Sequence, residues 1–388
     1  MTVEKTLFGI DEFLKHSSEY KNKRIGLVTN NAATSSYGEL TRLALDKKGF
    51  RIIKLFSPEH GLDVRGADGS FQDNTTDKLT GIPVISLYGE NLAPSENDLS
   101  GIDIVLFDVP DVGSRFYTYL WTMTHVLEAC STLNKPLIIL DRPNPIGGNL
   151  LLAEGPMLDE ENCSSFIGRW NIPIRHSCTL GELAGYFIKT KKIIVDLTIV
   201  KIENWNRHET KKDISWNFTA TSPAIRDIET ALLYPGMGLM EGINVNEGRG
   251  TDFPFKIIGA PWINAELLVH QFQSLALPGI NSNEYVYTAA DSVYKNECCR
   301  GIKLTIEDAS VLKPVLTGLE LIRLLIKLFP ENCKEKKYPT RANPAGENHL
   351  DKLTGVFHSF KKIKSGEIMN EYKKGNNWKE KITPFLLY

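Results

Sequence analysis

The sequence predicts an α/β protein: a Rossmann-like, mostly parallel sheet with helices on both faces, followed by a smaller C-terminal α+β domain. Two observations support this. Short apolar runs alternate with amphipathic helical segments through the first two-thirds of the chain. These runs are apolar almost without interruption, as is typical of strands buried on both faces of a parallel sheet. Beyond Trp216 the pattern changes to mixed, lysine-rich segments, so we place the domains at 1–222 and 223–388.

The individual elements follow from composition and spacing. Thr179 and Glu182 form a capping-box pattern that begins one helix, and Pro330 ends another. Runs rich in β-branched and apolar residues predict strands at 24–30, 50–56, 83–88, 102–108, 136–141, 193–202 and 300–306. Apolar residues at helical spacing predict helices at 38–48, 117–133, from 179 onward and at 319–328.

Composition narrows the class of protein. The chain has 388 residues, of which 42% are hydrophobic and 24% charged, as in an ordinary globular protein. Its net charge of −2 gives no reason to expect a nucleic-acid partner. No run of 18 apolar residues predicts a membrane span, and no signal peptide is visible. We therefore expect a cytoplasmic protein as the sequence stands, and a periplasmic or secreted one if an export signal has been removed.

Four predicted strands end in a polar residue that is followed by a loop rich in glycine or proline. These ends are Asn30, Glu59, the segment 108–111 and the segment 141–145. Parallel strands deliver their carboxyl ends to one edge of a sheet, where open α/β sheets bind ligands. We expect the four loops to converge on a single crevice. The long loop at 62–80, rich in glycine and aspartate, is also expected to have a functional or mobile role.

Glu59 and His60 form the first candidate site. They follow a buried strand that Pro58 ends, because proline has no N–H for the ladder. A carboxylate and an imidazole at this position are suited to acid–base chemistry. The alternative is a solvated loop glutamate beside a structural histidine.

The segment 108–119 forms the second candidate. It combines Asp108 and Asp111 with Arg115 and Tyr117 in a loop that leads into a helix. Arg115 offers a fork of donors that matches a substrate carboxylate or phosphate. Aromatic rings in a loop often stack on sugars, although Tyr117 alone is better explained as a core residue with a satisfied hydroxyl.

The third candidate is the glycine-rich segment 241–251, which carries Glu241, Asn244, Glu247 and Arg249. Such a composition is not typical of a packed element, and it favours a binding loop. We expect this segment to bring Glu247 or Glu241 opposite Glu59. His176 is a fourth, weaker candidate, since a lone histidine is more often structural.

Several familiar signatures are missing. Neither a dinucleotide-binding glycine motif nor a Walker A motif is present, and no Gly-x-Ser-x-Gly elbow indicates a serine hydrolase. We expect no cofactor. A hard-metal site built from Glu59, His60, Asp108 and Asp111 stays open as an alternative.

Four motifs together resemble one known family. They are 57–61 (SPEHG), 108–119 (DVPDVGSRFYTY), 141–148 (DRPNPIGG) and 241–251 (EGINVNEGRGT). They resemble the motifs of the exo-β-N-acetylmuramidase (NamZ-like) family, formerly a domain of unknown function (DUF1343). The resemblance runs from about Gly9 to the closing Tyr388.

The resemblance implies a Rossmann-like domain with a smaller C-terminal domain, and release of N-acetylmuramic acid from the non-reducing end of peptidoglycan fragments. The family's proposed catalytic glutamate matches Glu59. Members with this activity are exported, whereas this chain shows no export signal. The residues expected to contact the substrate are His60, Asp108, Asp111, Arg115, Tyr117, Asp141, Arg142, Asn144, His176, Asn244 and Arg249.

Glycoside hydrolysis needs a proton donor and a second group at the oxocarbenium-like centre. We take Glu59 as general acid and Glu247 as second carboxylate, with Glu241 as the next choice for the second carboxylate. Retention, inversion and participation of the substrate's acetamide all stay open. The lactyl carboxylate of muramic acid calls for a cation: Arg115 or Arg249 first, then Arg142 or Arg175. The rivals are a sugar- or nucleotide-binding protein without turnover, and a metal-assisted hydrolase that uses Glu59, His60 and Asp108.

Overall fold

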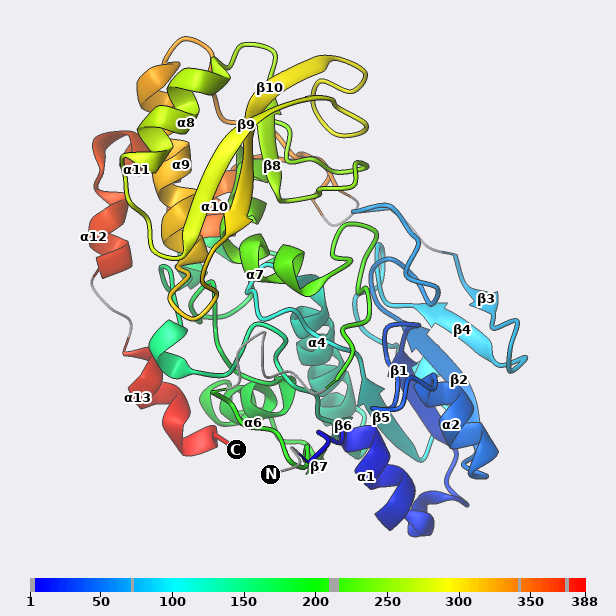
Figure 1. Cartoon of the computed structure of the whole chain (residues 1–388). Coiled ribbons are helices and arrows are strands. Elements are labelled where there is room, and N and C mark those ends of the chain that lie inside the picture. The colour runs from blue at the N-terminus through cyan, green and yellow to red at the C-terminus, as the bar shows by residue number, and fades with distance from the viewer. Residues whose placement is uncertain (1–3, 71–72, 209–215, 341–342, 374–376) are drawn as a thin grey trace.

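The computed structural model describes residues 4–70, 73–208, 216–340, 343–373 and 377–388. It contains a seven-stranded, mostly parallel sheet in the first half of the chain and a three-stranded antiparallel sheet with helices in the second (Figure 1). This arrangement confirms the predicted fold class. Within the described ranges, no helix has the length and apolar character needed to cross a bilayer.

The first sheet has the strand order β3-β4-β2-β1-β5-β6-β7. All neighbours pair in parallel except β3 and β4. In the register of β1 with β5, Thr29 lies opposite Asp108, so the two strands end together at the carboxyl edge. The strands are β1 (Ile25–Thr29), β2 (Ile52–Ser57), β3 (Thr75–Thr76), β4 (Pro83–Ser86), β5 (Ile104–Asp108), β6 (Leu137–Leu140) and β7 (Leu197–Val200).

Helices cover both faces of this sheet because its strands present apolar side chains alternately to each side. On one face Leu27 packs in a cluster with Phe13 of α1 and Leu45 of α2. On the other, Val28 shares a larger core with α4 and α6. The helix expected from residue 38 begins at Thr41, because Gly38 has φ +86°. The first-half helices are α1 (Gly9–His16), α2 (Thr41–Lys47), α3 (Glu96–Leu99), α4 (Thr118–Thr132), α5 (Glu160–Cys163) and α6 (Leu180–Thr190).

The second sheet has the order β8-β10-β9, with β8 (Ile257–Ala260), β9 (Ile280–Thr288) and β10 (Cys298–Ile306). In this half the helices α7 (Ile228–Met237) and α9 (Pro314–Leu328) cross closely at Gly236 and Gly318. A Cβ on Gly236 would lie 1.8 Å from the carbonyl oxygen of Pro314. The helices of this half are α7 (Ile228–Met237), α8 (Ala265–Gln273), α9 (Pro314–Leu328), α10 (His349–Thr354), α11 (Ser359–Ser365), α12 (Ile368–Lys373) and α13 (Trp378–Ile382).

The end of the chain returns to the first domain, where α13 lies beside α6 (Figure 1). The Trp378 side chain is fully buried, and its Nε1–H donates to the carbonyl of His176 at 2.8 Å. The hydroxyl of Tyr388 donates to Asp141 at 2.8 Å and accepts from the N–H of Ile202 at 2.9 Å. The last residues therefore complete hydrogen bonds of the first sheet and its loops.

Candidate active site

Strand β2 delivers Glu59 to the carboxyl edge of the first sheet. Directly after it, His60 and Gly61 adopt φ angles of +68° and +74°, a left-handed conformation that is rare for a non-glycine residue and clusters at functional sites. The chain therefore reverses, and the next loop folds back over Glu59. The N–H of Gly69 donates to Glu59 Oε1 at 2.9 Å, and His60 Nδ1 hydrogen-bonds the carbonyl of Gly66 at 2.9 Å.

The carboxyl group of Glu59 is almost completely buried, with 5% of the residue exposed. Thr118, the first residue of α4, donates its hydroxyl to Glu59 Oε2 at 2.7 Å. Burial raises the pKa of Glu59, and the negative charge of Asp68 raises it further, against the opposing effects of His60, Thr118 and Gly69. The environment therefore favours the protonated carboxyl group, as a general acid requires.

Asp68 is the acidic pocket residue that the sequence reasoning missed. It lies in the 62–80 loop, of which residues 71 and 72 fall outside the described ranges. Tyr338 donates its hydroxyl to Asp68 Oδ2 at 2.6 Å, and Arg249 Nη2 lies 3.6 Å from the same atom. The side chain of Asp68 is 30% exposed. Its partial burial opposes ionisation, but Arg249, then His60 and Tyr338, lower the pKa of Asp68. The length and composition of the loop were the only sequence signals of its role.

Arg249 is surrounded by carboxylates. It is ion-paired with Glu241, and its Nε lies 3.4 Å from Glu247 Oε1. Burial opposes its charge, but Asp68, Glu241 and Glu247 hold the pKa of Arg249 well above its usual value. Glu241 lines the pocket, whereas Glu247 is fully buried and does not. Burial raises the pKa of Glu247. Glu241, the second choice for the second carboxylate, therefore lines the pocket in place of Glu247, the first choice.

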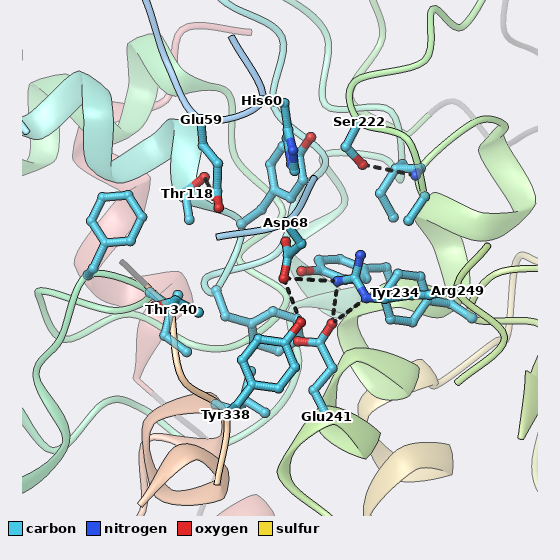
Figure 2. A pocket seen from close by; sticks show the side chains of 18 of the residues that line it. Glu59, His60, Asp68, Thr118, Ser222, Tyr234, Glu241, Arg249, Tyr338 and Thr340 are labelled. Carbon is cyan, nitrogen blue, oxygen red and sulfur yellow. Dashed lines mark hydrogen bonds and ion pairs between the residues drawn. The ribbon is translucent and has the colours of Figure 1, made fainter. Parts of the chain in front are cut away.

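These groups meet in a pocket between the two halves of the chain (Figure 2). The first half contributes Glu59 and Asp68, and the second half faces them with Glu241, Arg249 and Tyr338. The remaining lining residues are His60, Tyr88, Phe116, Tyr117, Thr118, Phe166, Ile167, Ser222, Ala224, Ile225, Tyr234, Phe255, Thr340, His349 and Leu353. Of the predicted site residues, Glu59, His60, Tyr117, Glu241 and Arg249 line it.

Arg115 does not reach this pocket. It is fully buried and donates to the carbonyls of Pro156 and Ile172 at 2.8 Å and of Leu353 at 2.9 Å. Burial lowers the pKa of Arg115 to about 9. Its guanidinium joins segments of the chain, a position that gives no support to the expected role in binding a substrate anion. Arg175 is also buried and donates to backbone carbonyls.

Asp108 and Arg142 form a buried ion pair at the carboxyl edge, away from Glu59. Thr41 also donates to Asp108 at 2.5 Å, and Arg142 Nη2 donates to the carbonyl of Thr34 at 2.7 Å. The expected single crevice is therefore divided: Glu59 faces the active-site pocket, and the Asp108–Arg142 pair lies under a separate cavity. A metal site combining Glu59 with Asp108 has no support in this arrangement.

The other predicted residues also lie outside the pocket, and most of their side chains are buried and hydrogen-bonded. Asp111 contacts His176 Nε2 at 3.1 Å. Asp141 accepts from Thr179 at 2.7 Å, and burial raises the pKa of Asp141 to about 6. Asn144 donates to the carbonyl of Cys178 at 3.0 Å, and Asn244 donates to the carbonyl of Asn332 at 2.9 Å.

One group of side chains in the pocket has a spacing that suits a metal ion. Glu59, His60 and Asp68 each offer one ligand atom, and these three atoms lie within 4.8 Å of one another. The carbonyl of Gly66 can only accept, so His60 Nδ1 carries the proton, and neutral His60 presents an Nε2 lone pair. Two carboxylates and an imidazole fit a divalent cation by donor chemistry.

Comparisons with known proteins identify the family. Two profiles match the chain: "Exo-beta-N-acetylmuramidase NamZ, N-terminal" over residues 25–229 and "Exo-beta-N-acetylmuramidase NamZ, C-terminal" over residues 232–388. The chain belongs to the NamZ family of exo-β-N-acetylmuramidases. It is 37% identical over 372 residues to "Peptidoglycan beta-N-acetylmuramidase NamZ" of Bacillus subtilis (strain 168), covering 94% of this chain and 87% of that protein.

Solved structures agree with the NamZ assignment. Two crystal structures of DUF1343 family proteins from Bacteroides fragilis NCTC 9343 match 99% of this chain and 99% of their own. One has a TM-score of 0.85 at 27% identity, and the other a TM-score of 0.73 at 28% identity. The resemblance drawn from the four motifs is confirmed.

Proposed function

We propose that this protein is an exo-β-N-acetylmuramidase that releases N-acetylmuramic acid from the non-reducing end of peptidoglycan fragments. The observation that carries the proposal is the pair formed by Glu59 and Asp68. Burial and a neighbouring charge raise the pKa of Glu59, whereas Arg249 and its neighbours lower that of Asp68 against the effect of burial. Two carboxyl groups whose pKa values are pushed apart divide naturally into an acid and an anion.

In this mechanism Glu59 protonates the glycosidic oxygen, a step worth on the order of 10²–10⁴-fold in rate. Asp68 supplies the negative charge at the oxocarbenium-like centre. Oxygen atoms of the two side chains lie within 4.8 Å of each other, which is shorter than the ~6.5–9.5 Å separation of inverting enzymes. We therefore expect retention, with Asp68 either attacking the sugar or orienting its acetamide.

Arg249 is the proposed partner of the lactyl carboxylate. Among the described residues that line the pocket it is the one arginine, and they include no lysine. Burying the lactyl charge without a cation would cost several kcal/mol. Arg249→Ala should reduce the preference for muramic over glucosamine glycosides, and Arg249→Lys should keep part of it. An unchanged preference in both variants removes Arg249 from this role.

The deciding experiment is hydrolysis of a chromogenic β-glycoside of N-acetylmuramic acid by the wild type and Glu59→Gln. We expect turnover to fall by at least about 10²-fold, with an unchanged melting temperature. Near wild-type turnover would show that Glu59 is not the acid. NMR of the fresh product should show the β-anomer first, and initial α-anomer would exclude retention.

The spacing of Glu59, His60 and Asp68 favours metal-assisted hydrolysis as a second candidate. These residues would hold the ion, which would supply Lewis-acid chemistry. A cation there would favour ionised Glu59 and leave it without the proton that acid catalysis needs. The two mechanisms therefore differ in their response to a chelator.

A further inference from the structure

A tight turn brings two large apolar side chains, Phe166 and Ile167, to the active-site pocket. The residues on either side of them, Ser165 and Gly168, pair through two backbone hydrogen bonds. The N–H of Ser165 donates to the carbonyl of Gly168 at 2.8 Å, and the N–H of Gly168 donates back at 3.1 Å. Small and polar residues dominate the central positions of turns. The turn itself therefore does not explain why a phenylalanine and an isoleucine occupy them.

The base of this turn is fixed to helix α4. Arg169, which follows the turn, donates to Thr124 at 2.6 Å and to Glu128 at 2.7 Å, both on α4. Ser164, which precedes the turn, donates its hydroxyl to the carbonyl of Arg169 at 3.0 Å. The tip of the turn is thus held in one position before any ligand arrives. Such preorganisation lowers the entropic cost of binding.

The two side chains of the turn have different surroundings. Ile167 packs against the main apolar core, whereas the ring of Phe166 lies 5.1 Å from that of Tyr88, measured between centroids. Tyr88 is buried beside Glu59. Burial and then the negative charge of Glu59 raise the pKa of Tyr88, against a hydrogen bond with Thr340. Phe166 is only half-buried, so part of it stays open to solvent at the side of the pocket next to Glu59.

The opposite side of the pocket is closed. Four further aromatic side chains that line it are each at most 7% exposed: Phe116, Tyr117, Tyr234 and Phe255. The guanidinium of Arg249 lies over the ring of Phe255, 4.9 Å from its centroid. Figure 2 shows Arg249 and Tyr234 on one side of Asp68 and Thr340, which is half-buried like Phe166, on the other. The pocket therefore has a closed end at Arg249 and a half-open side at Phe166.

This arrangement assigns the two sides of the scissile bond. The step rests on the proposed function, in which Arg249 pairs with the lactyl carboxylate and so holds the muramic acid ring at the closed end. The glycosidic oxygen that Glu59 protonates then faces the half-open side. A pyranose ring has an apolar C–H face, which gains free energy when it covers a flat apolar ring. We propose that the ring of Phe166 is the surface on which the leaving sugar stacks, so that Phe166 determines specificity for the leaving group.

The test measures hydrolysis of the disaccharide N-acetylmuramyl-N-acetylglucosamine by the full-length wild type and its variants. Phe166→Ala should lower kcat/KM by about tenfold, which corresponds to about 1.4 kcal/mol of transition-state binding. Phe166→Tyr keeps an aromatic ring and should stay close to the wild type. Phe357→Ala is the matched control and should leave kcat/KM unchanged, because Phe357 is 38% exposed and is not among the described residues that line the pocket.

A second measurement separates contact with the leaving sugar from a general effect of the substitution. Free N-acetylmuramic acid, which carries no leaving sugar, should inhibit the wild type and Phe166→Ala with the same inhibition constant. Phe166→Leu, which lacks the flat ring but keeps an apolar side chain, tests the same point if Phe166→Ala does not fold. Wild-type kcat/KM in both variants, or an equal loss of affinity for N-acetylmuramic acid, would overturn the inference. A wild type that does not hydrolyse the disaccharide would instead overturn the proposed function, and this inference with it.

Discussion

Replacing Thr118 by valine is predicted to raise the pKa of Glu59, the proposed catalytic acid. The Thr118 hydroxyl donates to Glu59 Oε2 at 2.7 Å in a buried site, and this bond lowers the pKa of Glu59 by favouring its ionised form. Valine has nearly the same shape but cannot donate. A hydrogen bond to a charged group is worth about 1.5–3 kcal/mol, and one pKa unit corresponds to about 1.36 kcal/mol. The pKa should therefore rise by about 1–2 units.

The assay is the pH profile of kcat/KM with a chromogenic muramic acid glycoside. In the proposed mechanism activity needs protonated Glu59 and is lost as pH rises through its pKa, so the alkaline limb should move upward in Thr118→Val. Stability depends on pH in the same direction. Because the pKa of Glu59 is raised in the folded state, protonation of Glu59 stabilises the fold at low pH, and this contribution is lost as pH rises through the folded-state pKa. Thr122→Val is the matched control, since Thr122 is buried one turn later and bonds the backbone of Thr118 instead. An alkaline limb that stays in place or moves downward would refute the reasoning.

Three further predictions concern neighbouring groups. Asp68→Asn should reduce kcat and also shift the alkaline limb downward, because the charge of Asp68 raises the pKa of Glu59; an upward shift would contradict this coupling. Arg115→Ala should lower the free energy of unfolding by at least about 3 kcal/mol, since three buried carbonyls lose their donor. Denaturant unfolding measures that loss against the exposed control Arg226→Ala, expected to change stability by less than about 0.5 kcal/mol. Treatment with a chelator should leave turnover unchanged, and loss of activity that Mg²⁺ or Mn²⁺ restores would favour the metal-assisted mechanism instead.

The position of Glu59 could be predicted because local rules determine it. A buried strand ends at Pro58, and the carboxyl ends of parallel strands meet at one edge. Asp68 is different. It reaches Glu59 only because the loop reverses at His60 and then meets Tyr338, which is distant in sequence. Neither spacing nor composition encodes that meeting, so the sequence indicated a functional loop without indicating which residue acts.

Arg115 shows the opposite failure. An arginine in a loop after a strand favours a ligand-binding role, because charged side chains are seldom fully buried. Here the guanidinium is enclosed, and its two terminal nitrogens donate to carbonyls from three separate segments. The loop after β5 therefore has a structural role, because Arg115 connects three segments of the chain through hydrogen bonds. Only the packing of both halves of the chain distinguishes this use of arginine from anion binding, and Arg249 in the facing loop has the position that suits a ligand.

The contacts made by Trp378 and Tyr388 have a consequence for synthesis on the ribosome. Domains generally fold as they emerge, the N-terminal one first. Here Asp141 and the carbonyl of His176, both in loops of the first domain, are bonded by residues that are translated long after that domain. A nascent chain that has already exposed the whole parallel sheet still lacks these partners. These hydrogen bonds can therefore form only after residues 378–388 have left the ribosome.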